Sequence, residues 1–177
     1  MSAASGVALF AVVVFMPSYF QIARGLAPAN AGAHLMPLMA GITVASVGTG
    51  RLLMVTGRVR GTALAACALL TLSFIGLALI VRDPSLPLAW SSACLVPLGL
   101  GLGALFPLVS VVAQRAAPMP LMGMAMASPV MFRSVAGAVG VAALAALPGG
   151  TFWAAAGVSL LALVVARALP VRLSRDA

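Results

Sequence analysis

The sequence predicts an all-α membrane protein: six transmembrane helices in a single domain that spans residues 1–177. Apolar residues make up 63% of the chain, and charged residues only 7%. The apolar residues gather in long stretches almost free of charge, separated by short loops with arginine, proline or glycine. A hydrocarbon core of about 30 Å requires roughly 20 apolar residues in a helix, and lipid offers no partner to backbone amides. Each long stretch is therefore expected to be helical.

The expected helices, in chain order, cover residues 4–23, 31–55, 62–81, 88–113, 121–147 and 151–169. The first does not resemble a cleavable signal, because it has no basic segment before it and runs into Pro17 and Tyr19. Little of the chain lies outside the six spans. We therefore expect any function to lie within the membrane or at its two faces.

Prolines divide the six helices into two groups of three. The first, second, fourth and fifth helices contain internal prolines, namely Pro17, Pro37, Pro97 with Pro107, and Pro129. The third and sixth contain none, so we expect these two to face lipid. Because the second group starts on the opposite side of the membrane, the pattern predicts a 3+3 inverted repeat whose proline-bearing helices line a cavity. The alternative is that prolines are simply more frequent in membrane helices.

Arginine positions predict the orientation, because basic loops resist translocation. With both termini in the cytoplasm, seven arginines lie on the inner side and two on the outer side. The inner set is Arg51, Arg58, Arg60, Arg115, Arg167, Arg172 and Arg175, and the outer set is Arg24 and Arg82. The net charge of +8 then reports topology and attraction to anionic lipid rather than binding of nucleic acid.

Four segments stand out in order along the chain. They are FMPSYFQIARGLAPANAGAHLMPL (Phe15–Leu38), GRLLMVTGRVRG (Gly50–Gly61), LGLGLGALFPL (Leu98–Leu108) and MGMAMASPVMFRSVAGAVGVA (Met122–Ala142). Together they resemble the C-terminal half of the fourteen-helix drug:proton antiporters of the major facilitator superfamily. The second segment resembles the superfamily's cytoplasmic loop motif, whose residues here are Gly50, Arg51, Gly57, Arg58 and Arg60. The family normally has an acidic residue where this chain has Met54, which favours a membrane-anchoring role for the loop over a salt-bridge latch.

The resemblance implies half of a secondary active transporter that moves a small apolar or amphipathic molecule by alternating access. It implies proton-coupled multidrug efflux, with an N-terminal half, in the same or a separate chain, required for coupling. All ten basic residues are arginine, which favours a GC-rich coding sequence and hence a bacterial inner membrane. This chain has only two carboxylates, Asp83 in a loop and Asp176 at the tail, and neither lies within a membrane span. The alternative is a truncated, non-transporting remnant or a half that modulates a full-length relative.

Arg133 is the most informative single residue, because it lies about 12 residues into the fifth expected helix. A charge at that depth is costly and should face the bundle or a cavity, where it would contact an anionic substrate group or an acidic residue of the missing half. The alternative is that its side chain snorkels to the cytoplasmic interface. The candidate cavity residues are Tyr19, Gln21, Met36, Phe106, Met131, Phe132 and Arg133. Small residues expected to allow close helix packing are Gly99, Gly101, Gly103, Gly137 and Gly140.

Other classes of protein lack their required residues. A metal-dependent enzyme needs clustered His, Cys or carboxylates, and the sequence has one His, two Cys and two carboxylates, all scattered. We expect no enzyme activity, no metal and no cofactor. His34 lies at the outer end of the second expected helix, where a titrating role is one interpretation and a tolerated interfacial residue is the other. Cys67 and Cys94 are interpreted as small packing residues.

Overall fold

The computed structural model describes residues 2–57, 59–82, 87–146 and 157, and these residues form helices and turns without a strand. Five helices within this part are long and apolar enough to cross a membrane. The described part of the chain is thus all-α and suited to a lipid bilayer. The sixth expected helix, residues 151–169, lies outside the described residues.

The helices alternate with short connections. Their bounds are Ser2–Ile22 for α1, Pro28–Ala33 for α2, Met36–Thr56 for α3, Val59–Arg82 for α4, Leu88–Ala116 for α5 and Met122–Ala145 for α6. A 3-10 turn, Met119–Leu121, leads directly into α6. The helix expected over residues 4–23 begins two residues earlier, and the one expected over residues 88–113 continues to Ala116.

The helix expected over residues 31–55 lies in one membrane-capable stretch, Pro28–Thr56, which a turn at residues 34–35 divides into α2 and α3. The short α2 ends at Ala33, and α3 begins at Met36 with Pro37 in its first turn. Proline lacks an N–H and its ring clashes with the carbonyl four residues earlier, which here belongs to Ala33. Pro37 is therefore tolerated at a helix start, and the preceding turn breaks away from the α3 axis.

The other internal prolines do not break their helices. α1 runs through Pro17, α5 through Pro97 and Pro107, and α6 through Pro129. Proline within a membrane helix is tolerated where neighbouring helices and Ser or Thr side chains compensate for the disturbed backbone. These three helices are therefore continuous through their prolines.

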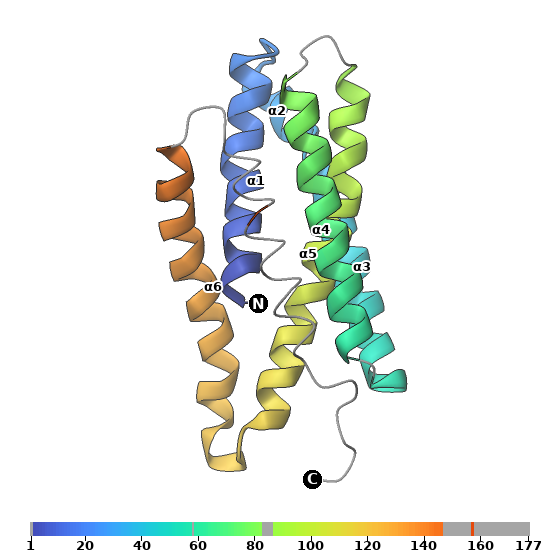
Figure 1. Cartoon of the computed structure of the whole chain (residues 1–177), viewed down its shortest axis with the longest axis vertical. Coiled ribbons are helices and arrows are strands. Elements are labelled where there is room, and N and C mark those ends of the chain that lie inside the picture. The colour runs from blue at the N-terminus through green and yellow to red at the C-terminus, as the bar shows by residue number, and fades with distance from the viewer. Residues whose placement is uncertain (1, 58, 83–86, 147–156, 158–177) are drawn as a thin grey trace.

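Two pairs of parallel helices form the bundle (Figure 1). α1 packs along α6, and α3 packs along α5, with the two members of each pair running in the same direction. α4 packs antiparallel against the other side of α5. Consequently α6 and α3 lie at opposite flanks of the described bundle, with α1 and α5 between them.

Glycines permit the closest approach between α3 and α5. A Cβ added at Gly41 would lie 2.8 Å from the carbonyl oxygen of Val96 on α5. Cβ atoms added at Gly99 and Gly103 would collide with the backbone carbonyls of Leu38 and Ile42 on α3. The two backbones therefore touch over more than one turn, which is how small residues bring membrane helices together.

The α1–α6 pair is built in the same way. A Cβ at Gly6 would collide with the backbone carbonyl of Arg133. From the other side, Gly137 accommodates the ring of Phe10, and Gly140 accommodates the side chain of Val7. The hydroxyl of Ser2 also donates a hydrogen bond to the carbonyl of Pro129.

Burial differs between the central and flanking helices. In the most apolar stretch of each helix, half of the residues of α4 are buried, but only 11% of those of α6. The buried residues of α4 form a stripe that includes Cys67, Leu70, Phe74 and Leu77. The expectation that the proline-free helix 62–81 faces lipid therefore holds for only part of its surface, such as Leu72. The stripe is buried because α5 covers it, with Leu70 packed against Gly101.

Candidate functional site

Arg133 of α6 and Phe106 of α5 form the contact with the clearest chemistry. The guanidinium carbon of Arg133 lies 4.4 Å from the centre of the Phe106 ring, which is cation–π distance. Both side chains are half-buried. The sequence proposed both residues for a cavity wall, and the structure brings them together from two helices.

The position of this pair along the helices matters for its electrostatics. Arg133 is the twelfth residue of α6, about 16 Å from the start of the helix at 1.5 Å per residue. Phe106 lies ten residues before the end of α5. The guanidinium therefore lies at the level of the helix interior, over a ring, and does not extend to the end of either helix.

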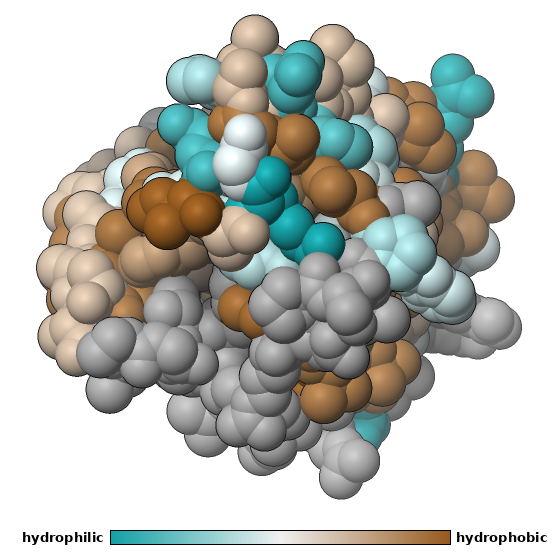
Figure 2. All heavy atoms as spheres, turned by 90° about the horizontal axis from the view of Figure 1, so that it is seen from above, coloured by the Kyte–Doolittle hydropathy of each residue, from teal (hydrophilic) through white to brown (hydrophobic). Residues whose placement is uncertain are grey.

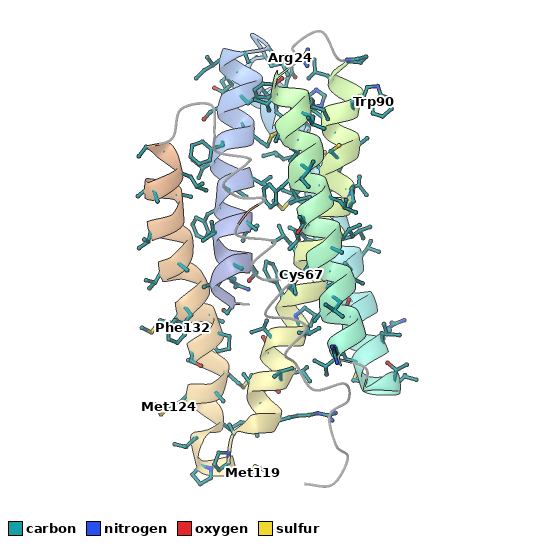
Figure 3. All side chains as sticks on the ribbon, viewed as in Figure 1. Arg24, Cys67, Trp90, Met119, Met124 and Phe132 are labelled. Atoms are coloured by element: carbon teal, nitrogen blue, oxygen red, sulfur yellow. The ribbon has the colours of Figure 1, made fainter. Side chains whose placement is uncertain are left out.

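Three further cavity candidates lie on the flanking helices α3 and α6 and are exposed. Met36 on α3 is 70% exposed, and Met131 and Phe132 on α6 are 65% and 62% exposed. Figure 3 shows Phe132, with Met124, on the side of α6 that points away from the other helices. Exposed methionines and apolar residues are thus concentrated on the two flanking helices, in the part of the chain that the structure describes.

The remaining cavity candidates lie at the end of the bundle that carries α2. Figure 2 views this end and shows hydrophilic residues gathered near its middle. The Arg24 Nε donates a hydrogen bond to the Tyr19 hydroxyl, 3.3 Å away, and its guanidinium lies 5.9 Å from the Tyr19 ring centre. Gln21 is exposed. Tyr19 is therefore engaged with Arg24, and Gln21 faces outward.

His34 forms a contact that the sequence gave no reason to expect. Its Nδ1 lies 2.9 Å from the hydroxyl oxygen of Ser92 on α5, and its ring centre lies 5.3 Å from that of Phe20 on α1. The neighbouring Ser91 hydroxyl is fully buried without a hydrogen-bond partner among the described residues. The imidazole joins three helices at this end. Residues 34 and 92 are too far apart in the sequence for spacing to have signalled the contact.

The residues of the loop motif cover the end of α3, the connection and the start of α4. Gly50 is half-buried, Arg51 is exposed, and Arg60 is half-buried in the first turn of α4. Gly57 ends α3 in the left-handed conformation, at φ 61°, and its N–H donates to the carbonyl of Leu53. Arg58 lies outside the described residues.

The described residues offer few side chains that could form ion pairs or bind a metal ion. The described residues include no Asp or Glu, since Asp83 and Asp176 both lie outside them. No group of three or more metal-ligating side chains occurs in the same part of the chain. Cys67 and Cys94 are free thiols, and Cys94 packs against Gly76.

Comparison with known proteins gives three informative similarities. The chain is 38% identical to MFS transporter L2 of Phoma sp. over 112 residues, which is 63% of this chain and 18% of that protein. It is 27% identical to a tetracycline resistance determinant of Streptomyces rimosus over 140 residues, 78% of this chain and 40% of that protein. It is 23% identical to the multidrug transporter protein MdtP of Bacillus subtilis over 141 residues, 80% of this chain and 26% of that protein.

The matched segment is thus between 18% and 40% of the length of these relatives. No protein-family model and no solved structure matched the chain. The chain is therefore similar to part of proteins named as MFS transporters, where MFS stands for major facilitator superfamily, and its five long apolar helices support an integral membrane protein.

Proposed function

We propose that this chain is the C-terminal half of a proton-coupled efflux transporter that exports small apolar or amphipathic molecules by alternating access. In this proposal the six helices form a 3+3 inverted repeat, with both termini in the cytoplasm. An N-terminal half, in the same or a separate chain, supplies the proton-coupling acid. The drug-related names of two relatives support this class of substrate.

One packing relation carries the proposal. The first helix of the first group, α1, packs on α6, which would be the second helix of the second group. The second membrane helix of the first group, α3, packs on α5, which would be the first of the second group. An inverted repeat requires this reciprocal pairing, because a twofold axis that exchanges the two groups also exchanges the two helix pairs.

The glycine contacts support the same relation at the level of residues. Gly6 precedes Pro17 by eleven residues, as Val96 precedes Pro107. On the partner helices, Arg133 follows Pro129 by four residues, as Gly41 follows Pro37. Aligning the prolines therefore makes the Gly6–Arg133 backbone contact equivalent to the Val96–Gly41 backbone contact.

The exposed flanks fit a missing half. α6 and α3 expose most of their apolar side chains, including Met36, Met131 and Phe132, and are the least buried of the membrane-capable helices described. A second bundle seated against both flanks would enclose a cavity between the halves, with α1 and α5 as its wall. Flexible methionines are suited to substrates of varied shape.

The first test is the mass of the native polypeptide in its own membranes, detected with an antibody to the tail, residues 169–177. A band near roughly 50 kDa, the size of about fourteen helices with loops, is the expected result for a half within a complete transporter. A band at 17.7 kDa without a co-purifying second chain would contradict the proposal and favour the remnant. Proton-driven transport by the purified 177-residue chain alone would also contradict it.

A further inference from the structure

The Arg133 guanidinium has no carboxylate partner in the part of the chain described here, because that part contains no Asp or Glu. A charge deep in a membrane helix is rarely left alone, since desolvation is costly without a counter-charge. Phe106 compensates for part of this cost through the negative face of its ring. A ring face, however, offers no lone pair to the five N–H groups of the guanidinium.

The pair is held in place by its backbones. The carbonyl of Arg133 packs against Gly6, and the preceding turn accepts the Ser2 hydrogen bond at Pro129. The carbonyl of Phe106 accepts a hydrogen bond from the Ser110 hydroxyl, 3.1 Å away. These contacts fix the two backbones, and the guanidinium itself lies over the Phe106 ring. Its planar group of N–H donors is the kind that recognises a carboxylate through two parallel hydrogen bonds.

We propose that Arg133 and Phe106 form a binding site for an amphipathic aromatic acid. The inference rests on the proposed function and specifies a substrate class for it. The guanidinium holds the carboxylate, the half-buried Phe106 ring offers a surface for the apolar part, and the exposed Val130 lies one turn before Arg133. The site selects amphipathic acids over neutral molecules of the same shape.

The test compares binding of 2-naphthoate with binding of 2-naphthamide, its uncharged isostere. The full 177-residue chain is placed in phosphatidylcholine nanodiscs, without anionic lipid, and titrated by calorimetry at neutral pH. We expect 2-naphthoate to bind roughly tenfold to a hundredfold more tightly, the range for a hydrogen bond to a charged group. Arg133→Gln abolishes the preference, and Arg133→Lys retains only part of it because lysine has no planar fork.

Matched controls separate the site from general positive charge. Arg115→Gln removes an exposed arginine from the last turn of α5 and is expected to leave the preference unchanged. Phe106→Leu keeps the charge and is expected to weaken 2-naphthoate binding. Circular dichroism verifies that each variant is folded. If Arg133→Gln does not fold, Arg133→Lys decides the question, and an unchanged preference in that variant overturns the proposal.

Three other results would overturn it. They are equal affinity for the two probes, a preference that survives Arg133→Gln, and loss of 2-naphthoate binding when phosphatidylglycerol replaces part of the lipid. The second result would mean that Arg133 pairs with a carboxylate of the protein or serves only in packing. The third would mean that the site binds a lipid headgroup. None of these measurements depends on transport, so their failure leaves the proposed function standing.

Discussion

Replacement of Gly41 by alanine tests the packing of α3 on α5 most directly. The added Cβ would lie 2.8 Å from the Val96 carbonyl oxygen, 3.2 Å from the Leu100 nitrogen and 3.3 Å from the Gly99 carbonyl carbon. Ordinary contacts begin at 3.4 Å, so the shortest of these falls about 0.6 Å short. All three neighbours are backbone atoms, which cannot rotate away as a flexible side chain can. The two helices must therefore separate.

Gly48 provides the matched control. It lies two turns further along α3, and a Cβ there would meet nothing within 4 Å. Both substitutions gain the same intrinsic helix preference of alanine over glycine, about 1 kcal/mol in water. The difference between the two variants therefore isolates the steric cost, which for overpacking is about 1–3 kcal/mol.

The assay is reversible unfolding of the reconstituted chain in mixed micelles of increasing sodium dodecyl sulfate, followed by far-ultraviolet circular dichroism. We expect Gly41→Ala to have a free energy of unfolding about 1–3 kcal/mol below that of Gly48→Ala. A difference under about 0.5 kcal/mol, the usual scatter for neutral substitutions, would refute the close approach of α3 and α5.

Three further predictions use the same unfolding measurement. Gly57→Ala should lower the free energy of unfolding by about 1–2 kcal/mol, because Gly57 has φ 61°, a left-handed conformation that alanine rarely adopts. Gly57→Asn should lower it less, and equal losses in the two variants would argue against the left-handed cap. A double-mutant cycle with His34→Ala and Ser92→Ala should give a coupling free energy of about 0.5–1.5 kcal/mol between the two side chains. If the two losses in free energy of unfolding simply add, the 2.9 Å contact between His34 Nδ1 and the Ser92 hydroxyl contributes nothing to stability. Gly101→Ala should lower the free energy of unfolding, because the new Cβ would lie 2.8 Å from the Leu70 side chain and 3.0 Å from the Ala66 carbonyl oxygen. Adding Leu70→Ala should relieve the part of this loss that comes from the side chain, and a loss that is not reduced at all would place the strain elsewhere.

The sequence located the membrane-capable helices well where apolar stretches are long. The expected spans 62–81 and 121–147 correspond to α4, Val59–Arg82, and α6, Met122–Ala145. It did not locate the turn that divides the stretch Pro28–Thr56 into α2 and α3, because Pro37 was interpreted as internal to the helix expected over residues 31–55. The signal was available, since proline is favoured in the first turn of a helix.

The site residues show the same division. Arg133 was identifiable from the sequence alone, because a charge within an apolar stretch is rare and costly wherever the helix packs. Its partner Phe106 was one of several candidates, and spacing could not select it. His34 was noticed, but neither Ser92 nor Phe20 was, because contacts between helices leave no mark in the local sequence.

The sequence by itself therefore determined where the membrane-capable helices of the described residues lie, and that Arg133 is a charge within one of them. Bilayer thickness and backbone hydrogen bonding make this possible, because they fix the length of an apolar helix from composition alone. What only the tertiary structure decided is the pairing, α1 with α6 and α3 with α5, and the meeting of Arg133 with Phe106. In a soluble protein the apolar stripe of a helix marks its buried face. In a membrane helix the lipid-facing and protein-facing sides are both apolar, so that mark is lost and only packing reveals which face meets which neighbour.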